Sequence, residues 1–229
     1  MTMENNKKIH LFDVDKTVVR KTSAEYFLII ALKEGFIKYS QINRLPFDWI
    51  KYKLTLPDMD FIENTVKKLS GLKRTDIDYV AEKCFINRLK PNIFSGAAQL
   101  INEKTAAGEK VIFATSSFDF IIKPLERFFG IEGSLASRME FKDGITTGNI
   151  DGYSFFGSKK KDAAKEWMNN NGINPLDVCF YTDSYTDIPL LEYCGTAVAV
   201  NPDRILTKKA KKQGWKILKF KKVLGSSAG

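Results

Sequence analysis

Histidine is almost absent from this chain: His10 is the only histidine among 229 residues. Ser-His-Asp and Cys-His catalysis both need a histidine as general base, so neither is available unless His10 itself serves. A zinc site built from histidine ligands is disfavoured for the same reason. His10 lies within a short apolar run, Ile9–Phe12, and we expect it to pack in the core rather than to bind a ligand.

Patterned cysteines and long hydrophobic runs are also missing. Cys84, Cys179 and Cys194 are odd in number and unpatterned, which is typical of a reduced cytoplasmic chain. The longest uninterrupted apolar run is Tyr26–Leu32, much shorter than the ~20 residues that a transmembrane helix needs. The first residues, MTMENNKK, contain no apolar signal-peptide core. We therefore expect a cytoplasmic protein without a transmembrane segment.

Acidic residues are absent from the segment 204–222, which contains nine lysines and arginines. The other 36 − 9 = 27 basic residues equal the 27 acidic residues, so the net charge of +9 belongs to this segment. Nine positive charges could follow a nucleic-acid backbone. However, Trp215 and Phe220 are the only aromatic residues here, and no recognition motif is present. We favour a solvated basic surface and keep nucleic-acid binding as the alternative. The basic residues are Arg204, Lys208, Lys209, Lys211, Lys212, Lys216, Lys219, Lys221 and Lys222.

The composition is otherwise that of a folded globular protein, with 44% hydrophobic and 12% aromatic residues. From Pro91 onward, short apolar runs alternate with stretches at helical spacing. Strands separated by helices predict an α/β fold with a doubly wound parallel sheet and helices on both faces. The expected strands are Ile9–Phe12, Val111–Ala114, Leu135–Phe141, Ile145–Ile150, Val178–Tyr181, Ala197–Val200 and Trp215–Phe220, and the expected helices between them are Ser95–Ala107, Asp119–Phe129, Lys159–Asn171, Ile188–Tyr193 and Asp203–Gln213.

Residues 19–90 differ from the rest because no stretch in them has the pattern of a strand. We expect an all-helical insert there, and a sheet domain formed by residues 1–18 and 91–229. The insert combines aromatic rings with lysines, and two interpretations are open. The rings form the insert's own small core, which we favour, or they face lipid or substrate. Its expected helices are Ala24–Lys33, Ile37–Lys53, one from Pro57 to Gly71, and Thr75–Leu89.

Two aspartates directly follow the first strand: Asp13 and Asp15, with Thr17 after them. Burying unpaired carboxylates is costly, and open α/β sheets bind their ligands at the carboxyl ends of strands. A binding site at this point is one interpretation. The other is a solvated turn in which Asp15 or Thr17 caps the next helix. The segments downstream favour the site.

Two further segments offer groups that suit a phosphate. Thr115, Ser116 and Ser117 follow Val111–Ala114, just before an expected helix, and hydroxyls with free amides at a helix N-terminus bind anions. Lysines 159–161 stand at the start of another expected helix, where they oppose the helix dipole unless an anion is bound nearby. Taken singly, an ordinary helix cap and a solvated lysine run are alternative explanations.

The last segment of this kind is VCFYTDSYTDIPLL. Asp183 and Asp187 follow the strand Val178–Tyr181, four residues apart across a turn. If they meet Asp13 at the same edge of the sheet, their hard carboxylate oxygens suit Mg²⁺, which takes one or two carboxylates and keeps water or substrate phosphate as other ligands.

Taken in this order, the four segments resemble the motifs of the haloacid dehalogenase superfamily of phosphohydrolases over nearly the whole chain. DVDKT is similar to its first motif, Thr115 to its second, a lysine of the KKK run to its third, and DSYTD to its fourth. The helical insert after the first motif resembles the cap domain of the phosphoserine-phosphatase-like branch. The resemblance implies a phosphatase with a Rossmann-like core and an all-helical cap.

The resemblance also implies a role for each matching residue. Asp13 would be the nucleophile that becomes an aspartyl phosphate, and Asp15 the acid that protonates the leaving oxygen and then activates water. Thr115 and the amide of Ser116 would hold the phosphoryl oxygens, and Lys160 would neutralise their charge. Lys160 lies at the family's spacing from Trp167, and Lys159 is the fallback.

The implied cofactor is Mg²⁺, which screens the repulsion between a carboxylate nucleophile and a phosphate dianion. Its implied ligands are Asp13, the backbone carbonyl of Asp15, and Asp183. Asp187 lies nearby and, in one arrangement, binds the ion through a water molecule.

The substrate implied is a phosphomonoester. Phosphoserine phosphatases carry a glutamate shortly after the first motif, and Thr22 stands there in this chain. This departure speaks against phosphoserine, and the substrate that we expect is a small phosphorylated metabolite. The alternatives are a lipid phosphate such as phosphatidylglycerophosphate or a lysophospholipid, reached by peripheral membrane contact, and a non-catalytic protein that binds phospho-ligands.

Overall fold

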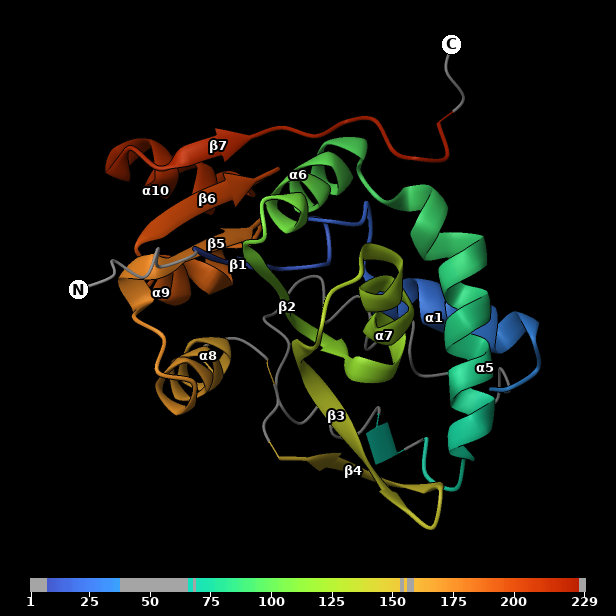
Figure 1. Cartoon of the computed structure of the whole chain (residues 1–229). Coiled ribbons are helices and arrows are strands. Elements are labelled where there is room, and N and C mark those ends of the chain that lie inside the picture. The colour runs from blue at the N-terminus through green and yellow to red at the C-terminus, as the bar shows by residue number, and fades with distance from the viewer. Residues whose placement is uncertain (1–7, 38–65, 68, 153–154, 156–158, 227–229) are drawn as a thin grey trace.

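The computed structural model describes residues 8–37, 66–67, 69–152, 155 and 159–226, and these form a seven-stranded sheet with helices around it (Figure 1). The strand order is β4-β3-β2-β1-β5-β6-β7, so β1 lies in the middle. The strands are β1 (Ile9–Phe12), β2 (Lys110–Phe118), β3 (Ser134–Lys142), β4 (Ile145–Asp151), β5 (Val178–Thr182), β6 (Thr196–Val200) and β7 (Lys216–Leu218).

Parallel pairing dominates the sheet. β4 is antiparallel to β3, and the other five neighbouring pairs are parallel. β3 and β4 form a hairpin whose turn residues Asp143 and Gly144 have φ of 51° and 76°. Positive φ at both central residues is the type I′ geometry that Asp-Gly favours. The hairpin expected from the sequence is therefore confirmed.

Side chains of β1 alternate between the two faces of the sheet. Leu11 joins a hydrophobic cluster with residues of α8, α9 and α10, whereas Phe12 joins the cluster of α1, α5, α6 and α7. Helices thus cover both faces, and the predicted doubly wound α/β sheet is confirmed. Figure 1 shows α8, α9 and α10 on the left and α1, α5 and α7 on the right. The helices are α1 (Ser23–Lys33), α5 (Arg74–Cys84), α6 (Ser95–Ala106), α7 (Asp119–Phe129), α8 (Lys159–Asn170), α9 (Ile188–Leu191) and α10 (Arg204–Gln213), and the short helical turns are Phe85–Leu89, Lys90–Asn92, Pro175–Asp177 and Tyr185–Asp187.

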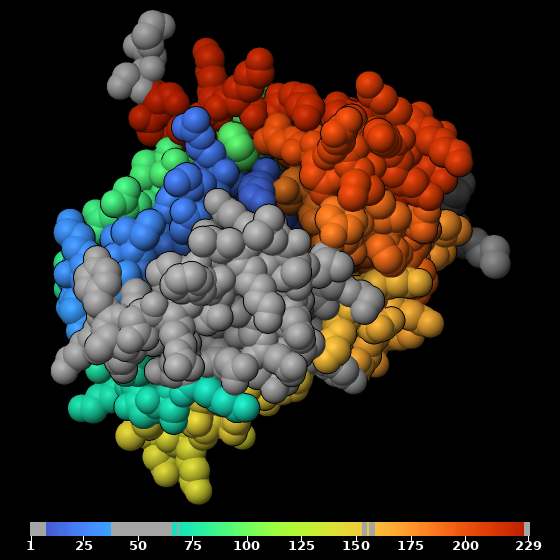
Figure 2. Space-filling model, turned by 180° about the vertical axis from the view of Figure 1, so that it is seen from behind, coloured from blue at the N-terminus to red at the C-terminus, as the bar shows by residue number. Residues whose placement is uncertain are grey.

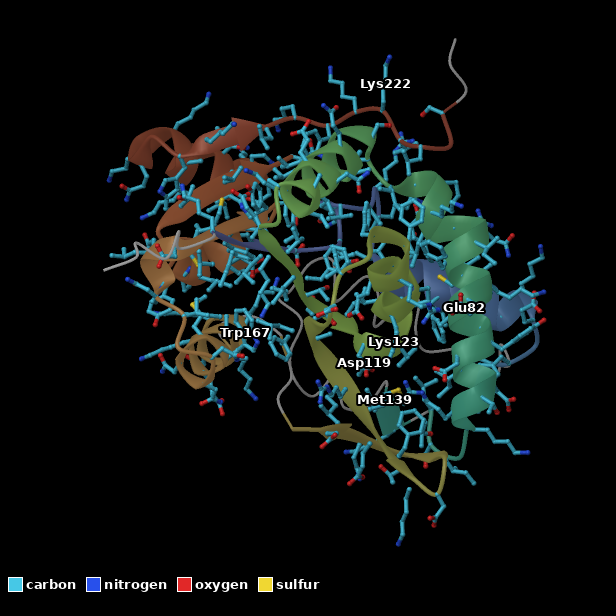
Figure 3. The ribbon with its side chains drawn as sticks, viewed as in Figure 1. Glu82, Asp119, Lys123, Met139, Trp167 and Lys222 are labelled. Atoms are coloured by element: carbon cyan, nitrogen blue, oxygen red, sulfur yellow. The ribbon has the colours of Figure 1, made fainter. Side chains whose placement is uncertain are left out.

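β2 differs most from its expected length, because it runs through Thr115, Ser116 and Ser117 to Phe118. α7 begins only at Asp119, with Phe118 as its N-cap residue (Figure 3 labels Asp119). The prediction that the hydroxyl run stands at a helix N-terminus is therefore wrong. Pairing with β3 extends the strand: Phe118 pairs with Ser137 after a register shift that begins at Ala114. Register irregularities of this kind, β-bulges among them, redirect side chains near sheet rims.

The described residues of the segment 19–90 pack directly on the sheet and its helices. α1 and α5 share one hydrophobic cluster with α7 and with the sheet, including Phe27, Val80 and Phe120. Phe27 and Phe120 form an edge-to-face ring pair with centroids 5.2 Å apart. The expected helix Ile37–Lys53, its ring-rich stripe, and most of the helix ending at Gly71 lie outside the described residues.

The remaining sequence expectations concern single residues. His10 is 2% exposed and packs between β2 and β5 as a core residue. The three cysteines are buried and free. In the described part of the chain, no helix is long and apolar enough to cross a membrane.

Candidate active site

The site forms where β1 ends, in the middle of the sheet. Phe12 pairs with Phe113 of β2 and Tyr181 of β5, so the residues just beyond these three meet at one edge of the sheet. Asp13 is the first residue after β1, and its backbone N–H donates to the Tyr181 carbonyl at 2.8 Å. The Asp13 residue is only 5% exposed.

Lys160 reaches this edge from the first turn of α8. Its Nζ donates to Asp13 Oδ1 at 2.8 Å and to Asp187 Oδ2 at 2.9 Å. All three residues are buried, whereas the neighbouring Lys159 is exposed. Of the two lysines singled out in the sequence, Lys160 is thus the one that contacts both aspartates.

Asp187 is held a second time by Thr182, the last residue of β5. The Thr182 hydroxyl donates to Asp187 Oδ2 at 2.6 Å and accepts from the backbone N–H of Ser184 at 3.3 Å. Sequence reasoning did not single out Thr182. Its position at the end of a buried strand, directly before Asp183, could have indicated that it belongs to the site.

Asp15 lies beside the N-terminus of α1. Its Oδ1 accepts a hydrogen bond from the backbone N–H of Ser23 at 2.8 Å. Lys16 lies between Asp15 and Thr17. Its φ of 59° is in the left-handed region, which a sharp turn requires. Thr17 is buried, and its hydroxyl has no hydrogen-bond partner within the described residues.

The residues of β2 complete the edge. Thr115 is fully buried, and its Oγ1 accepts from the backbone N–H of Ser117 at 3.1 Å. Ser116 is partly exposed. Ser117 lies within hydrogen-bond reach of Ser23, from the start of α1. Sequence reasoning named the Ser117 hydroxyl among groups that suit a phosphate but did not pair it with Ser23, because a contact across 94 residues leaves no local pattern.

Negative charge exceeds positive charge at this edge. Burial raises the pKa of Asp13 to about 7, and the charges of Asp187 and Asp15 add to the rise, although Lys160 opposes it. Burial likewise raises the pKa of Asp183 to about 8, with Asp13 as the next cause. Burial lowers the pKa of Lys160, but Asp13 and Asp187 outweigh it, so the ammonium stays charged.

The excess of acidic side chains over basic ones indicates that this edge could hold a metal cation. When ionised, Asp13, Asp183 and Asp187 carry three negative charges against the one positive charge of Lys160, and the difference equals the charge of one divalent cation. No described residue donates a hydrogen bond to the Asp183 carboxylate, so its oxygens remain available as ligands. The donors are hard oxygens, which suit Mg²⁺.

Among the described residues, no three acidic, histidine or cysteine side chains already form a metal cage. Mg²⁺ does not require one, since it binds through one or two carboxylates and completes its shell with carbonyls, water and substrate phosphate. The residues present therefore fit Mg²⁺ as a partly solvated ion rather than as a fully caged one.

Comparison with curated proteins places the chain among hydrolases. Residues 10–192 match the haloacid dehalogenase-like hydrolase family. The chain is 32% identical over 215 residues to the inhibition of morphological differentiation protein of Streptomyces azureus, covering 91% of this chain and 77% of that protein. It is 27% identical over 221 residues to a histidinol-phosphatase of Neisseria meningitidis serogroup C, covering 94% of this chain and 100% of that protein.

Solved structures of related proteins have the same fold as this chain. A protein of unknown function from Bordetella pertussis Tohama I superposes with a TM-score of 0.84 at 25% identity, over 93% of this chain and 98% of that one. A phospho-aspartyl intermediate analogue of phosphoserine phosphatase superposes with a TM-score of 0.66 at 25% identity, over 95% of each chain. With a family match over most of its length and phosphatases among its relatives, this chain belongs to the haloacid dehalogenase-like hydrolases.

Proposed function

We propose that this chain is a Mg²⁺-dependent phosphomonoester hydrolase that works through an aspartyl phosphate on Asp13. The observation that carries the proposal is the buried contact of Lys160 Nζ with both Asp13 and Asp187, at the carboxyl end of the central strand. Burying three charged side chains is costly, and a catalytic site is the usual reason for retaining them.

Asp13 is the nucleophile in this proposal. Lys160 holds Asp13 Oδ1, and no described residue donates to Oδ2, which is left to attack phosphorus. The structural relative captured as a phospho-aspartyl analogue supports the same chemistry here. Asp13 attack breaks the bond between phosphorus and the ester oxygen, and the departing oxygen takes a proton from Asp15.

Asp15 is suited to that proton transfer. It is partly exposed, burial raises its pKa, and hydrogen bonds from Ser23 act in the opposite direction. A carboxyl group with a raised pKa holds a proton closer to neutral pH, as a general acid requires. After the leaving group departs, the same carboxylate accepts a proton from the water that hydrolyses the aspartyl phosphate.

Three residues would hold the phosphoryl oxygens: Thr115, the backbone N–H of Ser116, and Lys160. The Lys160 ammonium supplies fixed positive charge where the phosphoryl group develops its negative charge. When bound to Asp13, Asp183, Asp187 and the carbonyl of Asp15, Mg²⁺ would screen the charge of the phosphate from that of the nucleophile.

For the substrate, we propose a small soluble phosphomonoester. The curated relative that aligns over its full length is named a histidinol-phosphatase, and the phospho-aspartyl structure is a phosphoserine phosphatase. Both names describe small phosphorylated metabolites. Residues 38–65, which would decide between these and a lipid phosphate, lie outside the described part of the chain.

Hydrolysis of p-nitrophenyl phosphate tests the proposal. Activity should require Mg²⁺, disappear on chelation with EDTA, and return when Mg²⁺ is restored. The Asp13→Asn variant should lose at least about a thousandfold in kcat, because the amide is no nucleophile. A protein that binds phosphate but turns nothing over would support the non-catalytic alternative. Full activity of Asp13→Asn would refute the mechanism.

A further inference from the structure

A buried chain of hydroxyl groups leads away from Asp15. Ser23 is the first residue of α1 and is fully buried. Its backbone N–H donates to Asp15 Oδ1 at 2.8 Å, and its side chain lowers the pKa of the same carboxyl group, as a hydrogen bond from the hydroxyl does. The Ser23 hydroxyl also contacts the hydroxyl of Ser117.

The donors along this chain can be assigned. An ionised carboxylate only accepts, and in the protonated acid the oxygen without the proton also accepts. When the Ser23 hydroxyl donates to that oxygen, its own oxygen accepts from Ser117. Ser117 is joined in turn to Thr115, because its backbone N–H donates to Thr115 Oγ1 at 3.1 Å. Asp15 is thereby linked through Ser23 and Ser117 to Thr115, on the strand next to β1.

Helix capping alone does not explain this arrangement. The N-cap residue of α1 is Thr22, which makes no side-chain capping hydrogen bond. The backbone N–H of Ser23 already satisfies one helix donor with Asp15, and this bond needs no particular side chain. The hydroxyl makes the additional contacts, to Asp15 and to a residue 94 positions away.

We propose that the hydroxyls of Ser23 and Ser117 position the Asp15 carboxyl group for proton transfer to the leaving oxygen. One bond from the backbone fixes one carboxylate oxygen, and a second bond from the hydroxyl fixes the plane of the group. The other oxygen then faces the site. Ser23 and Ser117 are positioning residues, and Asp15 remains the catalytic acid. The proposal rests on the proposed function, since it assumes phosphoryl transfer to Asp13.

The dependence of kcat/KM on the leaving group distinguishes a positioning role from a purely structural one. A poor leaving group needs the proton from Asp15, whereas a good one departs without it. Ser23→Ala should therefore lower kcat/KM by about thirtyfold for phenyl phosphate and by less than about threefold for 2,4-dinitrophenyl phosphate, as general acid catalysis contributes about 10²–10⁴-fold. kcat/KM is the right quantity because it covers the steps up to transfer onto Asp13.

Ser117→Ala removes the other partner of the same contact, on β2, and leaves Ser23 unchanged. It should show the same selectivity for the poor leaving group, with a loss of about threefold to tenfold. The double variant should lose no more than Ser23→Ala alone, because the two hydroxyls act in sequence. Ser137→Ala is the matched control: Ser137 is buried in β3, and its hydroxyl accepts from Phe155 outside this chain of contacts.

Each outcome decides the proposal. Losses that are equal for both esters, or absent in both variants, would overturn it and leave Ser23 a structural residue. If Ser23→Ala does not fold, as judged by its thermal transition, the selectivity of Ser117→Ala decides. Wild-type protein that hydrolyses neither ester would instead refute the proposed function, which separates the two failures.

Discussion

Lys160 shows how a single residue links folding to the proposed chemistry. Its ammonium lies between two buried carboxylates, and all three groups have lost most of their hydration. Removing one member of such a group is strongly destabilising, because it leaves charges buried without a partner. The residue that would neutralise the phosphate also neutralises the buried carboxylates of Asp13 and Asp187.

Substituting Lys160 should therefore affect both stability and activity. Lys160→Met should lower the free energy of unfolding by about 3 kcal/mol and kcat/KM by at least about a hundredfold. The stability loss should be larger near pH 8 than near pH 6, because the Asp13 carboxyl group, whose pKa burial raises to about 7, becomes charged as the pH rises. Urea denaturation at both pH values measures this.

Lys159→Met is the control for that prediction, since Lys159 is the exposed neighbour on the same helical turn. It should change the free energy of unfolding by less than about 0.5 kcal/mol, the usual range for surface substitutions. Equal effects of the two substitutions would contradict the role that the contacts give to Lys160.

At the scale of elements, the hairpin of β3 and β4 pairs with the segment that leads into α5. The backbone N–H of Thr146 donates to the Leu72 carbonyl at 2.9 Å, and the Thr146 carbonyl accepts from the backbone N–H of Gly71 at 2.9 Å. Lys73 forms a bridge with Ile145. The Arg74 guanidinium lies 4.7 Å from the ring centre of Phe141. The segment 69–74 is thus joined to the hairpin almost as an extra strand.

Gly148 tests how tightly this contact is packed. Its φ is 82°, and an added Cβ would lie 2.9 Å from Ser70 Cβ and 3.2 Å from Lys67 Cα. Gly148→Ala should cost about 2–3 kcal/mol, with the left-handed φ contributing about 1 and the clash the rest. Thermal unfolding measures the loss.

Gly144 of the same hairpin provides the comparison. Its φ is 76°, but a Cβ there would meet nothing within 4 Å. Gly144→Ala should cost only the conformational term, about 1 kcal/mol. If the two variants are equally stable, the hairpin does not press against the insert.

Periodicity predicted the elements well where burial on one or both faces determines the pattern. β1 matches its expected bounds, and β5 and α10 match theirs within one residue, because apolar runs and glycine stops mark them. β2 was underestimated because Thr115, Ser116 and Ser117 are polar and resemble a cap. What extends the strand is its pairing with β3, which depends on tertiary structure and not on the local sequence.

The same distinction applies to the site. Asp13, Lys160 and Asp187 could be predicted to meet, because each follows a strand or begins a helix at one edge of the sheet, and the contacts bring them together. The contact between Ser23 and Ser117 could not be predicted, since nothing in the local sequence pairs a serine at a helix start with one in a strand 94 residues away. Their contact depends on how α1 packs against β2.

At the scale of the whole molecule, positive charge is concentrated at one edge. Figure 2 shows the residues of α10 and β7, in red, at the upper right of the rear face, and Lys222 extends outward from the upper edge in Figure 3. In the part of the chain that the structure describes, Lys209 is the only basic residue of 204–222 in an ion pair, with Glu192 at 2.6 Å. The other eight are exposed.

We predict that this edge is a solvated surface and does not bind nucleic acid at physiological salt. Phosphate contacts lose affinity steeply with salt, and no array of exposed rings is present to add stacking, since Trp215 and Phe220 are half-buried. A labelled oligonucleotide should therefore bind in low salt and dissociate by about 0.15 M, with a Kd above about 100 μM there. Micromolar binding at that salt, abolished by Lys211→Glu with Lys212→Glu but not by Lys123→Glu with Lys142→Glu, would reverse the interpretation and make this edge a polyanion site.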